Sequence, residues 1–215
     1  FDVGANEGQT IIEIYRSFPK SIVHSFEPLQ ECRKSLIFLK NKLKTLTIHL
    51  NFVGVGDKLC KKIFYKNNST NLSSFIKINK NSKLMIKMKK LKKNKKYLKG
   101  INIPIKINQI TLDSYIKKNK IKNIDILKID TQSYDDQVLK GLNKSYLKKI
   151  KSIIVEINLW DYYNRSQSFL NFEKILGKHF KLWDISAIYK NPKFKNTDHL
   201  DAIYLNKSYI KKIIN

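Results

Sequence analysis

The stretch FDVGANEGQT, residues 1–10, decides the fold, because it joins the end of an apolar strand to a turn with two glycines and to the start of a helix. Glycine has no Cβ, so a turn built on Gly4 and Gly8 can be tight and can let its backbone approach a ligand closely. Apolar side chains then recur at helical spacing over residues 9–18. This order of elements predicts the first unit of an α/β fold.

The same alternation of strands and helices continues along the chain. Apolar runs predict strands at residues 21–26, 46–55, 124–129, 150–157, 181–188 and 201–205. Periodic stretches predict helices at residues 29–43, 133–142 and 169–180, and a short helix opens at Thr111. Strands that alternate with helices pair mostly in parallel, and near-continuous apolar strands are typical of strands covered on both faces. We therefore expect an open, doubly wound, Rossmann-like sheet with helices on both faces.

The middle of the chain is less regular. Residues 61–65 and 72–78 are predicted to form a hairpin around residues 67–69, and residues 101–109 alternate as a half-buried strand does. Residues 79–100 are rich in Lys and form an insertion, either a solvated segment or an arm that binds anions. No Pro/Gly-rich linker divides the chain, so we expect residues 1–215 to form one domain. The sequence starts inside a strand without Met, and we expect the N-terminus to be missing.

The net charge of +26 has two explanations. Lys, Ile and Asn supply 92 residues whereas Arg supplies three, and those three abundant types are all encoded by A/T-rich codons. Arg is scarce although its planar fork binds phosphates best. We favour codon composition as the cause, and an anionic partner such as nucleic acid, a nucleotide-sugar or a membrane surface is the alternative.

Cysteine and histidine usage indicates neither disulfides nor a metal site. Cys32 and Cys60 do not form a disulfide framework, and the four histidines are scattered without metal-ligand spacing. We predict no metal and a reducing, cytoplasmic compartment. No apolar run reaches the 18 residues that a membrane span needs, so we predict none. The sequence leaves the oligomeric state open.

Acidic side chains follow several predicted strands, at the sheet edge where ligands bind in open α/β folds. Glu27 ends the second strand, 19 residues after Gly8, and an acid there can accept hydrogen bonds from both ribose hydroxyls of a nucleoside. The others on this edge are Asp2, Asp57, Asp130 and Glu156. A rim of carboxylates repels phosphates and attracts a cation, so it favours the sulfonium of S-adenosylmethionine over NAD or ATP.

These segments together resemble the FkbM-type methyltransferases. The matching pieces, in the family's order, are residues 1–9, 25–28, 51–57, 111–116, 126–142, 153–157 and 201–205. The resemblance implies a class I methyltransferase fold, with a seven-stranded sheet whose last strand is antiparallel. It also implies transfer of a methyl group from S-adenosylmethionine to a hydroxyl oxygen of a sugar, glycan or small molecule.

The resemblance also implies roles for individual residues. The methionine end of the cofactor lies by Asp2, Gly4, Asn6 and Gly8, the ribose by Glu27, the adenine by Val55, Gly56 and Asp57, and the transferable methyl by Asp130. This chain departs from the family after the fourth strand, where Ser133 replaces a glycine and Asp135 a glutamate.

A hydroxyl acceptor must lose its proton, so a general base assists the transfer. Asp130, Asp135 and Glu156 are the candidates. Each is also consistent with a structural carboxylate, and Asp135 can cap the helix that begins near Ser133. Aromatic side chains that either wall an acceptor pocket or pack in the core are Tyr134, Trp160, Tyr162 and Tyr163.

Two other hypotheses stay open. A nucleic-acid methyltransferase would give the basic charge a role, but the chain has no Asn-Pro-Pro-Tyr type of motif and no basic patch interleaved with aromatic residues, so we do not expect nucleic acid as the partner. A catalytically degenerate relative that binds a nucleoside or a protein is the other, because of the departures at Ser133 and Asp135.

Overall fold

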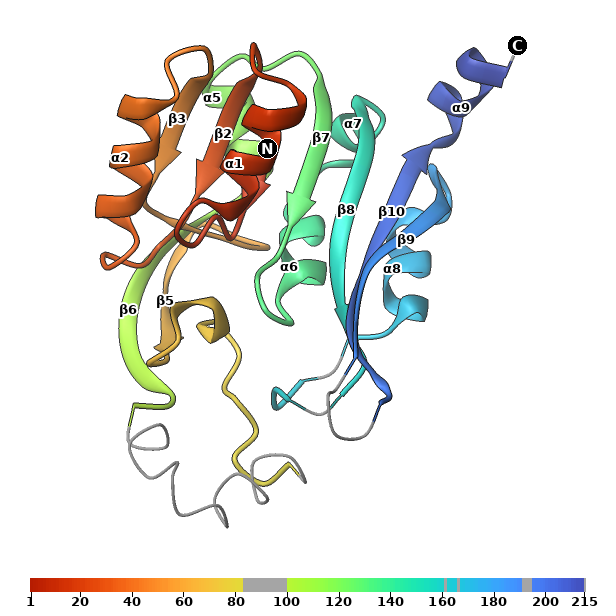
Figure 1. The fold of residues 1–215 in the computed structure, drawn as a ribbon. Coiled ribbons are helices and arrows are strands. Elements are labelled where there is room, and N and C mark those ends of the chain that lie inside the picture. The colour runs from red at the N-terminus through yellow and green to blue at the C-terminus, as the bar shows by residue number, and fades with distance from the viewer. Residues whose placement is uncertain (83–99, 161, 166, 191–194, 215) are drawn as a thin grey trace.

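The computed structural model describes residues 1–82, 100–160, 162–165, 167–190 and 195–214. Its main sheet has seven strands: β1 (Asp2–Val3), β2 (Ile22–Phe26), β3 (Thr47–Asn51), β7 (Ile124–Ile129), β8 (Ile150–Asn158), β9 (Phe180–Lys190) and β10 (Thr197–Asn206). Their order is β3-β2-β1-β7-β8-β10-β9 (Figure 1). The first five strands of this order are parallel, and β10 is antiparallel to both of its neighbours. The predicted parallel sheet with an antiparallel last strand is therefore confirmed.

Helices cover both faces of this sheet, as predicted. One face carries α1 (Gln9–Ser17) and α2 (Arg33–Lys42), and the other carries α5 (Leu112–Lys118), α6 (Asp135–Lys140) and α8 (Phe169–Leu176) (Figure 1). The short helices α7 (Lys144–Leu147) and α9 (Lys207–Ile214) precede β8 and follow β10. Ile11 and Leu36 belong to one apolar cluster, while Ile116, Val138 and Phe172 belong to the other. No described helix is long and apolar enough to cross a bilayer.

The α1 face is covered only in part. Among the described residues, no helix lies over β7, β8 and β10 on this side (Figure 1). Ile126 and Ile154 are half-buried there, whereas Ile129 and Val155 on the opposite face are fully buried. Residues of α1, β2, β7, β8, β9 and β10 line one cavity along this face.

A second, three-stranded sheet corrects the predicted hairpin. It is formed by β4 (Gly54–Val55), β5 (Cys60–Lys66) and β6 (Ile103–Ile110) in the order β4-β6-β5. β5 pairs along its whole length with β6, and residues 72–78 make a single bridge to β5 within the described part of the chain, Tyr65 to Ser74. The physical reason is that Phe64, Ile105 and Ile107 share one apolar cluster, which the pairing of β5 with β6 brings together.

Two further predictions concern residues 46–55, which contribute β4, and residues 79–100, which lie between β5 and β6 in the sequence. The strand predicted over residues 46–55 is divided, because β3 ends at Asn51 and Gly54–Val55 pairs with β6 instead. Most of the Lys-rich insertion predicted over residues 79–100 falls on residues 83–99, which lie outside the described residues. Thr111 caps α5 as its sequence predicts, because its side chain accepts a hydrogen bond from the Ser114 N–H.

Leu127 tests the buried sheet. Its side chain is fully buried on the helix-covered face of β7, so Leu127→Ala should lower the free energy of unfolding by about 2–5 kcal/mol. Ile22→Ala, at a side chain that is 65% exposed on β2, should lower it by about 1 kcal/mol or less. Urea denaturation of both variants measures the difference, and equal losses would contradict the assignment of the core.

Candidate functional site

A cavity of about 1420 Å³ opens at the carboxyl ends of the parallel strands and continues along the uncovered part of the α1 face. Six of the residues predicted for the site line it: Gly4, Asn6, Glu27, Val55, Asp130 and Glu156. The other five, as far as the described residues define the cavity, do not: Asp2, Gly8, Gly56, Asp57 and Asp135. The predicted edge therefore opens on a cavity, and part of the predicted set lies behind the cavity wall.

The turn after β1 depends on its glycines. Gly4 has φ 90°, and a Cβ added to it would lie 1.9 Å from the backbone oxygen of Asp130. Gly8 has φ 98° and precedes α1, and a Cβ there would lie 2.3 Å from a methyl carbon of Leu39. Only glycine permits both contacts without displacing neighbouring atoms. The first turn can therefore lie directly against the turn that follows β7.

Glu27 is held in one orientation at the end of β2. Its Oε1 accepts the Leu29 N–H at 2.8 Å and its Oε2 accepts the Asn6 N–H at 2.9 Å. Burial raises the pKa of Glu27 to about 7, although these two backbone hydrogen bonds oppose the change. A carboxylate oxygen can accept more than one hydrogen bond, so both oxygens keep capacity for a ligand in the cavity.

Asp2 lies beneath the cavity rather than in its wall. It is fully buried and stands in register with Lys128 on β7. Burial raises the pKa of Asp2 to about 6, and the Lys128 ammonium opposes that change. The charge of Asp2 therefore acts on Lys128, which forms an ion pair with Asp130 in the cavity wall.

Asp130 and Glu156 are joined by one side chain, that of Gln132. The Gln132 amide donates to Asp130 Oδ1 at 2.9 Å and to Glu156 Oε1 at 3.0 Å. Lys128 donates to Asp130 Oδ2 at 3.1 Å, so both oxygens of Asp130 are engaged. Asn158 donates to the same Glu156 Oε1 at 3.0 Å. Oε2 of Glu156 is thereby left without a hydrogen bond in the part of the chain that the structure describes.

Glu156 stands among other carboxylates. Burial, followed by the charges of Asp130 and Asp135, raises the pKa of Glu156 well above its ordinary value. Burial likewise raises the pKa of Asp135 to about 8, against a hydrogen bond that Asp135 Oδ1 accepts from the Thr131 N–H at 3.0 Å. Asp135 braces the turn between β7 and α6 and is fully buried, which fits a structural carboxylate. It does not cap the helix as predicted, because Asp135 is the first residue of α6 and its carboxylate points back to the Thr131 N–H.

That turn contains two consecutive residues in the left-handed region. Gln132 has φ 56° and Ser133 has φ 67°, and Ser133 is buried. The departure from glycine noted in the sequence thus falls where a side chain is strained. Tyr163 OH lies 2.8 Å from Gln132 Oε1, which holds the far end of the Gln132 amide.

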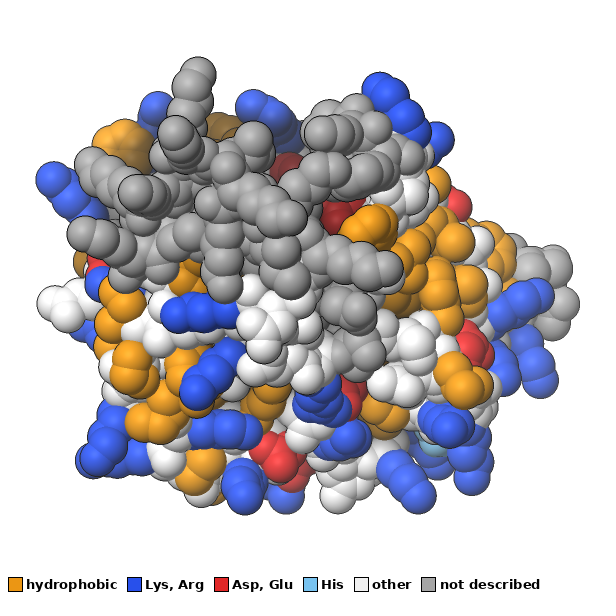
Figure 2. Space-filling model, turned by 90° about the horizontal axis from the view of Figure 1, so that it is seen from below, with side chains coloured by type: hydrophobic (Ala, Val, Ile, Leu, Met, Phe, Trp, Pro, Cys, Tyr) orange, Lys and Arg blue, Asp and Glu red, His pale blue; other side chains and the backbone are white. Residues whose placement is uncertain are grey.

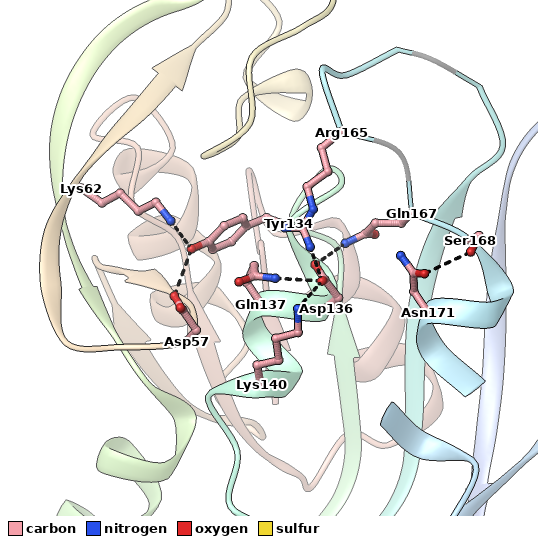
Figure 3. A network of polar contacts seen from close by, with 10 residues as sticks. All are labelled: Asp57, Lys62, Tyr134, Asp136, Gln137, Lys140, Arg165, Gln167, Ser168 and Asn171. Carbon is pink, nitrogen blue, oxygen red and sulfur yellow. Dashed lines mark hydrogen bonds and ion pairs between the residues drawn. The ribbon is translucent and has the colours of Figure 1, made fainter. Parts of the chain in front are cut away.

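Tyr134 connects the turn to the second sheet (Figure 3). Its hydroxyl accepts from Lys62 Nζ at 2.6 Å and donates to Gln109 Oε1 at 3.0 Å. Asp57 Oδ1 lies 3.4 Å from the same hydroxyl. Tyr134 is 1% exposed, so it packs in the core, whereas Tyr162 lines the cavity. Asp57 turns toward Tyr134 rather than toward the cavity.

Asp136 fixes the segment that follows β8 onto α6 (Figure 3). Its carboxylate accepts hydrogen bonds from Arg165 and, at 3.0 Å, from Gln167. Lys140 and Gln137 on α6 donate to the same group. The sequence analysis missed Gln132 and Asp136, although both lie in the quoted stretch of residues 126–142, where polar side chains follow an apolar strand.

The charged residues that line the cavity are mainly acidic, although the chain as a whole is strongly basic. Among the described residues, seven acidic side chains line the cavity, compared with two basic ones, Lys20 and Lys128, in a chain with 17 acidic and 43 basic residues. Among the described side chains that Figure 2 shows at the carboxyl edge, Lys and Arg lie scattered between hydrophobic and acidic ones. Among the described residues, no three His, Cys, Asp or Glu side chains gather as metal ligands would. The cavity therefore suits a neutral or cationic ligand.

Comparison with known proteins agrees with this geometry. The profile described as a methyltransferase FkbM domain matches residues 2–211. The chain belongs to the FkbM methyltransferase family. A search of curated proteins finds no match. The crystal structure of an FkbM methyltransferase from Methylobacillus flagellatus KT has the same fold, with 14% identity and a TM-score of 0.53. The match covers 95% of this chain and 42% of that one, so the chain spans less than half of that relative.

Ser133→Gly should raise the free energy of unfolding by up to about 1 kcal/mol, because glycine adopts the positive φ of this FkbM turn without steric cost. Ser145→Gly, at an exposed position in α7, should instead lower it by about 0.5–1 kcal/mol. Both values come from urea denaturation. If Ser133→Gly lowered the free energy of unfolding as much as Ser145→Gly does, the turn would not be strained.

Asp135 makes stability depend on pH. Its pKa is raised from 3.8 to about 8, so the folded protein holds this proton more tightly than the unfolded chain does. The resulting penalty is absent below about pH 4, grows as pH rises and is complete above about pH 8. Asp135→Asn keeps the oxygen that accepts the Thr131 N–H, so it should gain stability over the wild type as pH rises from 4 to 8. Asp125→Asn, at a side chain that is 77% exposed, is the control, and parallel curves for Asp135→Asn and the wild type would contradict the prediction.

Proposed function

We propose that this FkbM protein is an S-adenosylmethionine-dependent methyltransferase that methylates a hydroxyl oxygen of a sugar, glycan or small molecule. The family supports the class of reaction. The observation that carries the choice of donor is Glu27, fixed by two backbone hydrogen bonds in a cavity whose charged lining, among the described residues, is mainly acidic. The free thiols of Cys32 and Cys60 suit a cytoplasmic location, which we include in the proposal.

The residues present fit this donor. The turn over Gly4 and Asn6 leads into α1, whose first N–H groups suit the carboxylate of the methionine part. Glu27 would hold the ribose hydroxyls, and Val55 would lie by the adenine. Asp130 and Glu156 supply negative charge where a sulfonium would lie. When bound, the donor supplies a methyl carbon that is already activated by its sulfonium.

The chain's own residues then have two tasks, alignment and proton removal. For the second we assign Glu156, because it lines the cavity, its Oε1 is fixed by Gln132 and Asn158, and its Oε2 accepts no hydrogen bond from the described residues. Its raised pKa makes the buried carboxylate a stronger proton acceptor. Asp130 is engaged through both oxygens, and Asp135 lies behind the turn. We therefore give Asp130 and Asp135 supporting roles.

Past Glu156, the cavity wall is made by Asn158, Tyr162, Tyr189, Asp198 and His199. This wall combines aromatic rings with amide and carboxylate oxygens, a composition that suits a polar acceptor with several hydroxyls. A phosphorylated acceptor would meet carboxylates here, with Lys128 already paired to Asp130. The wall therefore favours an acceptor without anionic groups.

Glu27→Gln tests the donor site. The change replaces one acceptor oxygen with an amide NH₂, which cannot accept a backbone N–H or a ribose hydroxyl. We expect the dissociation constants of S-adenosylmethionine and of its demethylated product to rise roughly 10- to 100-fold, the equivalent of losing hydrogen bonds to a charged group. Isothermal titration measures both constants.

The matched control is Glu7→Gln, an exposed acid in the same turn, which should change both constants less than about twofold. Unchanged affinity in Glu27→Gln would remove Glu27 from the ribose site. A folded wild-type protein that binds neither ligand would refute the proposed function itself.

A further inference from the structure

His199, which the sequence analysis gave no role, stands beside the free oxygen of Glu156. The imidazole Nε2 lies 3.8 Å from Glu156 Oε2, and Nδ1 lies 4.0 Å from Asp198 Oδ2. The ring stacks on Tyr189 with centroids 4.3 Å apart and planes 20° apart. His199 also lines the cavity. The antiparallel pairing of β10 with β8 sets this neighbourhood, because it places His199 opposite Asn158 and Asp201 opposite Glu156.

The two side chains differ in access to solvent. The Glu156 side chain is 10% exposed, and that of His199 is 27% exposed. If Glu156 takes the acceptor's proton, as the proposed function holds, a buried neutral acid results, and it must lose that proton before the next turnover. Asp130 and Asp135, which surround it, favour retention of the proton. A second group that carries the proton from Glu156 to solvent is therefore needed.

We propose that His199 carries this proton from Glu156 to solvent. In the transfer, the hydroxyl O–H bond breaks and its proton goes to Glu156 Oε2, while the oxygen forms the bond to the methyl carbon and the C–S electron pair returns to sulfur. The neutral imidazole then takes the proton from Oε2 at Nε2 and releases one to solvent from Nδ1. The separation of 3.8 Å is closed by a small movement of the ring or by one bridging water.

Other groups around His199 fit this role. Asp198 and Asp201 lie on its own strand, Glu156 on β8 and Tyr189 on β9. On β7, Lys128 is paired with Asp130. The carboxylates near the ring stabilise an imidazolium formed in passing, and the stacked Tyr189 ring holds its plane. His199 is thus a relay group that acts through Glu156, and it need not touch the donor.

The test is the rate of hydrogen–deuterium exchange at Glu156, followed by infrared spectroscopy after rapid dilution into D₂O at about pH 7, where an ordinary imidazole is largely neutral. The raised pKa of Glu156 favours the protonated form of this carboxyl, and Glu156→Gln identifies its C=O band by difference. In His199→Gln the exchange should slow by roughly 100-fold or more, the size of a typical general acid–base contribution. Added imidazole should restore part of the rate in His199→Gly.

The matched control is His179→Gln, at the residue just before β9. In this variant, exchange at Glu156 should proceed at the wild-type rate. An unchanged rate in His199→Gln, or the absence of a Glu156 carboxyl band in the wild type, would overturn the relay. Circular dichroism of the same samples shows that each variant is folded, and binding of S-adenosylhomocysteine is measured separately. The inference rests on the proposed function, but the exchange needs neither donor nor acceptor. A protein that binds no nucleoside yet shows the exchange effect would therefore refute the methyl-transfer proposal alone.

Discussion

The contact between Gly4 and the backbone oxygen of Asp130 is the constraint on which the site depends. A Cβ at position 4 would lie 1.9 Å from that oxygen, so any other residue would push the turns after β1 and β7 apart. Because these strands are neighbours in the sheet, their turns share one wall of the cavity. The glycine allows the turn that contains Asn6, whose N–H donates to Glu27, to lie next to the turn that contains Asp130 and Gln132.

The second determinant is how the structure accommodates buried carboxyl groups. Asp2, Glu27, Asp135 and Glu156 are all buried, and burial is the first cause that raises the pKa of each. Backbone N–H groups, the Gln132 amide and Lys128 offset part of this cost. These buried carboxyl groups lower the stability of the folded protein, as is common where charge serves binding or proton transfer. It also explains how a chain of net charge +26 can present an acidic cavity.

The errors of the sequence analysis share a cause. The hairpin over residues 61–78 was wrong because β5 has a distant partner, β6, and pairing over a long separation leaves no local signal. Asp57 and Tyr134 follow or flank predicted strands, yet they meet each other between the two sheets. Gln132 and His199 were passed over because an amide and a lone histidine have no chemical signature until their neighbours are known. Each neighbour, Glu156 in both cases, comes from another strand.

The order of strands and helices, the glycine turn after β1 and the edge of the sheet at which acids gather could be predicted from the sequence, because hydrophobic periodicity and backbone freedom are local properties. Which of those acids face the cavity depends on how distant segments pack. Asp130 and Glu156 do so because parallel pairing aligns the ends of β7 and β8. Asp135 does not, because two left-handed residues at positions 132 and 133 turn the chain before α6 begins. Such a reversal depends on contacts between segments far apart in the chain.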